Sequence, residues 1–78
     1  MTTTQHTGAE DAIRVRLNGK EREIAGGGTV RDLLDSLDLH PGMVVVELNG
    51  EILERERYGD AAVREGDTLE LVHFVGGG

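Results

Sequence analysis

The sequence predicts a single α+β domain in which one main helix packs across a mixed sheet of four to five strands. Three observations predict it: two strand-like stretches each contain an Asn-Gly pair, a segment of helical spacing lies between them, and an alternating segment ends the chain. One helix across one sheet is the simplest way to bury the apolar face of that helix. A domain of this size buries only about 60% of the surface that its unfolded chain exposes, which disfavours an enclosed substrate cavity and a self-sufficient enzyme.

The first hairpin is predicted from a period of two. Apolar residues alternate with arginines over residues 13–17, which indicates a half-buried strand. Asn18-Gly19 follows at once, and Asn-Gly is typical of a type I′ turn because both central residues need positive φ. The two-residue loop fixes the register and places two opposite-charge pairs on the solvent side, namely Arg16 with Glu21 and Arg14 with Glu23.

The helix is predicted to begin at Thr29, because residues 29–32 (TVRD) match the [ST]-x-x-[DE] capping pattern. Apolar residues recur at i, i+3, i+4 and i+7 from Val30 to Leu37 and form one face. His40-Pro41-Gly42 is expected to end this segment, since the residue before a proline is pushed out of the helical region. The triplet at residues 26–28 lacks the lysine and the spacing of phosphate-binding loops, so we interpret it as a flexible connection.

The remaining elements follow from turn signals. Residues 43–48 form a β-branched run, and Asn49-Gly50 then predicts a second hairpin. Residues 54–63 have no clean period and are expected to be irregular with one turn of helix. Residues 64–67 form a turn.

The last strand, residues 68–75, alternates again. Leu69 and Leu71 fall on the core face, and Val72 and Phe74 fall on the opposite face. We expect this strand to be central and to lie beside the first, which predicts a β-grasp, the ubiquitin-like fold. An apolar patch on an open sheet face usually marks a partner site, so Val72 and Phe74 are the candidate docking residues.

Three segments are predicted along the chain: a disordered leader at residues 1–11, a β-grasp domain at residues 12–75, and a flexible glycine tail at residues 76–78. The leader is polar and has no apolar stretch of signal-peptide type. The chain has no cysteine, which excludes disulfides, a thiol nucleophile and a thiolate metal site. A reducing cytoplasm is the expected location.

The charge of the chain limits its partners. Eight Lys and Arg against 15 Asp and Glu give a net charge of −7, which makes nucleic acid and anionic membrane surfaces poor partners. Association with a basic partner surface is expected to be steered electrostatically. We expect no metal site, because the acids form no calcium-loop pattern, and no catalytic residue, because His40 and His73 have no nucleophile or carboxylate at a catalytic spacing.

The three closing glycines can be interpreted in two ways. A frayed tail without a role is the simpler interpretation. The glycines follow directly on an apolar strand, however, and would form a thin arm without Cβ atoms that ends in an ionised carboxylate. Such an arm can enter a channel too narrow for side chains.

Residues 13–78 resemble the ThiS family, the β-grasp sulfur carriers of thiamine biosynthesis. The matching segments are Thr29-Val30 through Leu33-Leu34, residues 46–51 (VELNGE), Glu65-Gly66-Asp67 and, most specifically, residues 70–78 (ELVHFVGGG). The resemblance implies that an E1-like adenylating enzyme uses ATP to convert the Gly78 carboxylate into an acyl-adenylate, with Gly76 and Gly77 threading into its active site. A persulfide donor then leaves a thiocarboxylate on Gly78, which thiazole synthase uses as its sulfur source.

The resemblance implies that the chain binds no cofactor itself and is a recyclable substrate. Other functions remain open at this point. Sister carriers of the same fold supply sulfur for molybdopterin, and further relatives serve cysteine formation or modify proteins. A ubiquitin-like docking module without tail chemistry is another alternative, but chain-linked tagging is disfavoured because Lys20 is the only lysine.

Overall fold

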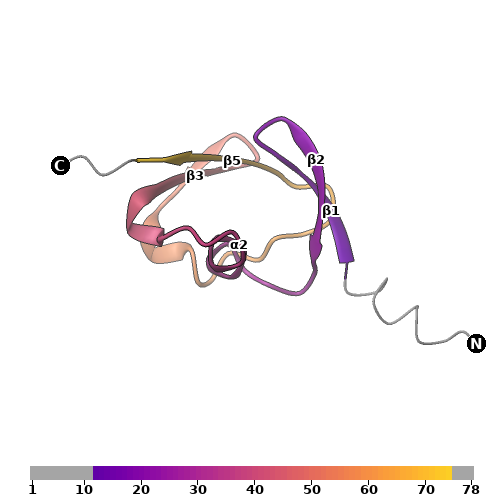
Figure 1. The fold of residues 1–78 in the computed structure, drawn as a ribbon, viewed down its shortest axis with the longest axis horizontal. Helices are drawn as coiled ribbons and strands as arrows, with labels where there is room; N and C mark the ends of the chain where they lie inside the picture. Colours follow the sequence, from indigo (N-terminus) through magenta and orange to yellow (C-terminus); the bar gives the residue numbers. More distant parts are fainter. Residues whose placement is uncertain (1–11, 75–78) are drawn as a thin grey trace, which may run out of the picture.

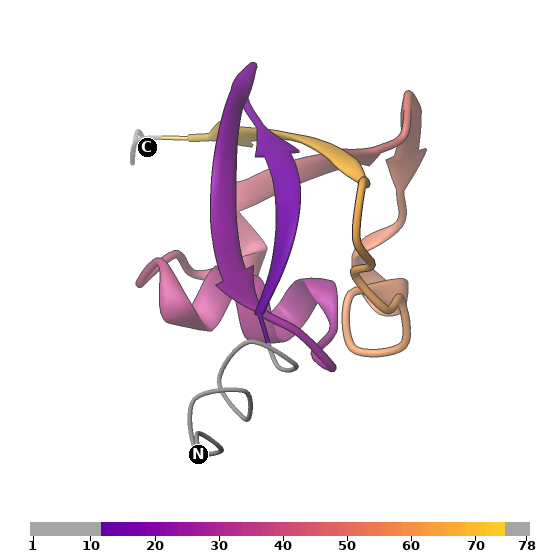
Figure 2. The same cartoon turned by 90° about the vertical axis from the view of Figure 1, so that its right-hand side faces the viewer.

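The computed structural model describes residues 12–74 and has the predicted β-grasp fold. A five-stranded mixed sheet in the order β2-β1-β5-β3-β4 carries helix α2 across one face (Figures 1 and 2). The elements are β1 (Ala12–Leu17), β2 (Lys20–Ala25), α2 (Val30–Ser36), η1 (Pro41–Met43), β3 (Val44–Leu48), β4 (Glu51–Leu53), η2 (Arg55–Arg57) and β5 (Thr68–His73). The predicted leader, Val75 and the glycine tail lie outside the described residues.

Both Asn-Gly turns form as predicted. Asn18 and Gly19 have φ of 51° and 85°, and Asn49 and Gly50 have φ of 53° and 87°, as a type I′ turn requires. The β1–β2 register is the predicted one, from Leu17 opposite Lys20 onward. The ion pair that forms is diagonal, from Arg14 to Glu21 at 3.5 Å, and both side chains are about 60% exposed, so it adds little stability.

Strand β5 occupies the centre of the sheet, as the sequence predicted. It runs parallel to β1 and antiparallel to β3. The parallel contact is short, with only Arg16 opposite Thr68 and Leu17 opposite Leu69. The antiparallel contact extends from Leu48 opposite Leu69 to Val44 opposite His73. Strand β5 is therefore held by β3 along its length and by β1 only at its beginning.

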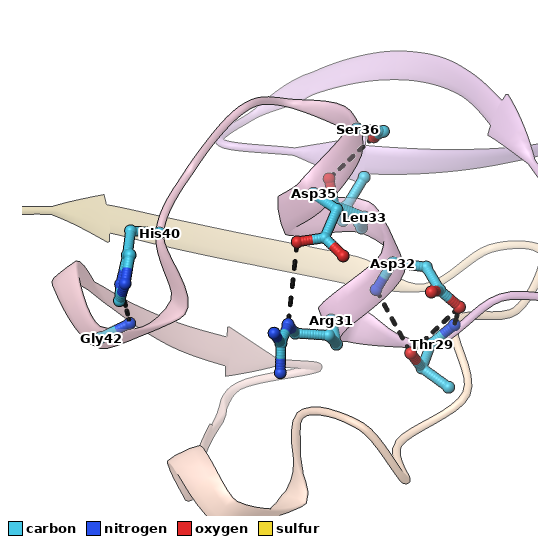
Figure 3. A network of polar contacts seen from close by, with 8 residues as sticks. All are labelled: Thr29, Arg31, Asp32, Leu33, Asp35, Ser36, His40 and Gly42. Atoms are coloured by element: carbon cyan, nitrogen blue, oxygen red, sulfur yellow. Dashed lines mark hydrogen bonds and ion pairs between the residues drawn. The ribbon is translucent and has the colours of Figure 1, made fainter.

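Helix α2 begins where the sequence predicted but ends earlier than predicted. Thr29 is the N-cap: its hydroxyl accepts from the Asp32 N–H, and the Asp32 carboxylate accepts from the Thr29 N–H (Figure 3). The helix ends at Ser36, before the His40-Pro41 boundary that the sequence indicated. Asp38 adopts φ of 62°, and the Leu39 N–H donates to the Leu34 carbonyl at 2.9 Å, which is a Schellman-type end.

The core lies between α2 and the sheet, and its buried apolar residues include two from the stretch that the sequence predicted to be irregular, Tyr58 and Val63. Tyr58, in the irregular stretch after β4, is only 3% exposed, and its hydroxyl donates to the Val44 carbonyl at 2.8 Å. The predicted helical turn in this stretch is η2. The full set of buried apolar residues is Val15, Leu17, Val30, Leu33, Leu34, Val44, Val46, Tyr58, Val63 and Leu69.

Candidate functional site

The candidate site lies on the sheet face that α2 does not cover, at the C-terminal half of β5. Side chains alternate along a strand, so Leu69 and Leu71 face the core, where Leu69 is fully buried and Leu71 is half-buried. Val72 lies on the other face and is 56% exposed. The predicted exposure of this side of the last strand is confirmed.

Phe74 extends this face beyond the end of β5. Its N–H donates to the Met43 carbonyl at 2.8 Å, which continues the β3–β5 ladder and keeps its side chain on the side of Val72. Phe74 is 48% exposed, so it is not a core residue. Neither side chain is needed to fill the interior of the domain.

Two further apolar residues share this face, and the sequence analysis missed both. Val45 lies directly opposite Val72 on β3 and is half-buried. Ile52 on β4 lies opposite Glu47 and is 70% exposed, the highest exposure among the large apolar residues described. The register of the second hairpin would have placed Ile52 on the face of Val45. We call Val45, Ile52, Val72 and Phe74 the apolar patch.

A pair of like charges borders the apolar patch. Glu47 on β3 lies directly opposite Glu70 on β5, an arrangement that destabilises a sheet. Five other acids of the domain are exposed: Asp32, Asp35, Asp38, Glu51 and Glu54. Beside the apolar patch, the open face carries the negative charge of Glu47 and Glu70.

The two candidate histidines take part in no catalytic arrangement in the described residues. His40 uses Nδ1 to accept the Gly42 N–H at 2.9 Å and caps η1 (Figure 3). His73 is exposed at the last position of β5. Within residues 12–74, no three His, Asp or Glu side chains come together where they could hold a metal ion. No helix in that part of the chain has the length and hydrophobicity to span a membrane.

The predicted tail residues, Gly76, Gly77 and Gly78, lie outside the described residues. The last described residue, Phe74, precedes Gly78 by four positions. Val72 and Phe74 of the apolar patch therefore lie on the segment of the chain that leads to the glycines.

The family assignment agrees with this geometry. The ThiS family model matches residues 15–78. The chain belongs to the ThiS family. The sulfur carrier protein ThiS of Bacillus subtilis is 45% identical over 65 residues, which cover 82% of this chain and 98% of that protein. This ThiS chain is accordingly a sulfur carrier protein of thiamine biosynthesis.

A solved structure and a longer relative extend the comparison. The crystal structure of the thiamine biosynthesis protein ThiS from Geobacter metallireducens superposes with a TM-score of 0.72 at 39% identity, covering 85% of this ThiS chain and all of that one. Thiazole synthase of Paramagnetospirillum magneticum is 41% identical over 66 residues. That match covers 85% of the ThiS chain but only 20% of the thiazole synthase, so a ThiS-like segment occurs within a longer protein of that name.

Proposed function

We propose that this ThiS chain carries sulfur as a thiocarboxylate on Gly78 and acts as a recyclable substrate of other enzymes, with no catalysis of its own. The observation that supports the proposal best is the apolar patch, because two of its four residues, Val72 and Phe74, lie on the segment that precedes the glycines. The composition adds a second argument. Because the chain has no cysteine, a side-chain persulfide is not available to it, which is compatible with sulfur held on the main-chain carboxylate.

The proposed chemistry begins with activation, because a carboxylate resists nucleophiles. An E1-like adenylating enzyme transfers AMP from ATP to the Gly78 carboxylate and releases pyrophosphate. The terminal sulfur of a persulfide donor attacks the acyl carbon and AMP leaves. A thiol then cleaves the S–S bond, which leaves the thiocarboxylate and a disulfide. In this scheme the chain binds no cofactor, and ATP is bound by its partner.

Each part of the site has a role in that scheme. Gly76 and Gly77 thread through the narrow entrance of the adenylating enzyme, where any Cβ atom would add width. Val72 and Phe74, with Val45 and Ile52 beside them, dock the domain against the partner. The negative charge at Glu47 and Glu70 favours a partner surface with basic residues around an apolar centre. A cytoplasmic location, where ATP is available, suits these reactions.

Thiazole synthase is the proposed acceptor of the sulfur. The ThiS-like segment in the longer thiazole synthases supports this partner, because two proteins that act together are also found joined in one chain.

The proposal is tested by intact-protein mass spectrometry of the chain incubated with the E1-like enzyme and a persulfide donor, with and without ATP. We expect an ATP-dependent replacement of one terminal oxygen by sulfur. Deleting Gly78 or making the Gly77→Val substitution should abolish the product and leave the thermal unfolding of the domain unchanged. Product formation on the truncated chain would contradict the tail chemistry. If the thiocarboxylated chain supported molybdopterin synthesis and not thiazole synthesis, thiazole synthase would be excluded as the acceptor of the sulfur.

A further inference from the structure

The short turn η1 holds Phe74 of the apolar patch. The Phe74 N–H donates to the Met43 carbonyl at 2.8 Å, beyond the end of β5. Met43 is the last residue of η1, and β3 begins directly after it at Val44. Val44 is fixed from the core, because its carbonyl accepts the Tyr58 hydroxyl. The carbonyl that holds Phe74 therefore lies between a fixed strand and a short turn.

Two side chains bind one peptide group of this turn. His40 accepts the Gly42 N–H on Nδ1 at 2.9 Å (Figure 3), and Arg55 donates from Nε to the Pro41 carbonyl at 3.1 Å. The Pro41 carbonyl and the Gly42 N–H belong to the same peptide group, which is thus bound at both ends. The His40 ring also lies close to Gly42, since a Cβ added there would lie 3.1 Å from Nδ1 and Cε1 of the ring.

This peptide group could adopt a second orientation. Proline followed by glycine is typical of a type II turn, in which the glycine has positive φ. Gly42 does not have positive φ, because η1 has the backbone of a 3-10 helix. The two forms differ by a flip of the peptide group between proline and glycine. The flip would turn the Gly42 N–H away from His40 and break the bond from Arg55, so these two side chains favour the observed form.

We infer that His40 is a positioning residue that keeps Phe74 in its place within the apolar patch. His40 holds η1 in one form, and η1 then presents the Met43 carbonyl to the Phe74 N–H. A turn that alternated between two forms would bind this N–H for only part of the time, and Phe74 would have to be ordered when the partner binds, which lowers affinity. This role rests on the proposed docking of the adenylating enzyme through Phe74.

The experiment compares His40→Ala with Thr29→Ala in calorimetric titration of the full chain with the E1-like enzyme. Both variants remove a capping side chain, but Thr29 caps α2, away from η1 (Figure 3). We expect His40→Ala to weaken binding about fivefold, as loss of a capping side chain typically does for the capped element, and Thr29→Ala to leave the affinity within about twofold. His40→Asn should restore the affinity, because an asparagine oxygen can accept the N–H two positions further on.

Two further measurements test whether His40 acts through Phe74. In the Phe74→Ala background, His40→Ala should weaken binding by less than about twofold, because the side chain that it positions is already removed. Amide hydrogen exchange needs no partner. Exchange at the Phe74 amide should be about fivefold faster in His40→Ala and unchanged in Thr29→Ala.

The outcomes separate the role of His40 from the proposed function. Equal losses of affinity in His40→Ala and Thr29→Ala, no restoration by His40→Asn, a full loss from His40→Ala in the Phe74→Ala background, or unchanged exchange at Phe74 would each overturn the role of His40 alone. If the unmodified chain did not bind the enzyme, the proposed docking would be rejected, and the role of His40 in docking with it.

Discussion

The two faces of the sheet use the same kinds of residues for different purposes. On the covered face, valine and leucine from β1, β3 and β5 meet α2, and most of them are less than a tenth exposed. On the open face, Val72, Phe74 and Ile52 are about half exposed or more, and two glutamates lie directly opposite each other. Strands with alternating side chains supply both faces at once.

The covered face of the sheet stabilises the fold, whereas the open face has the features of a binding site. Burial of apolar area stabilises the fold, and the covered face contains nearly all of it. The open face keeps apolar area in water and brings like charges together, and both features cost stability in the free protein. Features that lower the stability of the free protein and lie together on one surface are typical of binding sites.

The largest expected effect concerns the covered face. Leu34→Ala removes a fully buried side chain at the centre of the core and should lower the free energy of unfolding by about 2–5 kcal/mol. Ile52→Ala on the open face is the matched control and should change it by less than about 0.5 kcal/mol. Urea denaturation measures both. Similar losses of unfolding free energy in the two variants would show that both faces of the sheet contribute equally to stability.

The second effect concerns binding. Phe74→Ala should weaken the complex with the E1-like enzyme by about 1–4 kcal/mol if Phe74 anchors the interface, with little change in thermal stability because the side chain is 48% exposed. Calorimetric titration measures the affinity for the enzyme, and thermal unfolding of the same sample measures the stability of the domain. Unchanged affinity would exclude Phe74 as an anchor.

Local signals in the sequence predicted most of the fold. The Asn-Gly turns, the Thr29 cap and the alternation of β1 and β5 each depend on neighbouring residues, and each was confirmed. The end of α2 was predicted wrongly, because proline in the sequence indicated a boundary near His40 while Asp38 ends the helix in a left-handed conformation. An aspartate in that role has no strong sequence signature, since glycine is the usual residue there.

Long-range contacts were harder to predict. Tyr58 lies in a stretch without periodicity, and its place in the core depends on a hydrogen bond to Val44, 14 positions away. The hydrogen bond that the Leu71 N–H donates to the side-chain oxygen of Asn18 spans 53 positions. The β3–β4 register, which the Asn-Gly turn predicts, places Ile52 on the face of Val45, but Ile52 shares that face with Val72 and Phe74 only because β3 also pairs with β5 in the five-stranded sheet. Alternation alone identified Val72 and Phe74, but the extent of the patch depends on tertiary pairing.

The third effect depends on charge at long range. With its net charge of −7, the chain should associate with a basic partner faster at low salt, because the Debye length falls from about 30 Å at 0.01 M to about 8 Å at 0.15 M ionic strength. We expect the association rate to fall about tenfold over this range and the dissociation rate to change little. Stopped-flow binding measures both. If the association rate did not change with salt concentration, the acidic residues would contribute to solubility and not to association.

The smallest expected effect has opposite signs for the free and the bound protein. Glu70→Gln removes the repulsion from Glu47 directly opposite and should raise the free energy of unfolding by about 0.2–1 kcal/mol.

The same change removes a charge beside the apolar patch and should slow association with the adenylating enzyme. Glu51→Gln is the control, because it changes the net charge equally at an exposed position opposite Leu48, where no like charge faces it. It should leave stability nearly unchanged. If Glu70→Gln and Glu51→Gln behaved alike in both unfolding and binding, only net charge would matter. If Glu70→Gln alone raised the stability and slowed binding, the negative charge at Glu70 would be shown to lower the stability of the free protein and to favour partner binding.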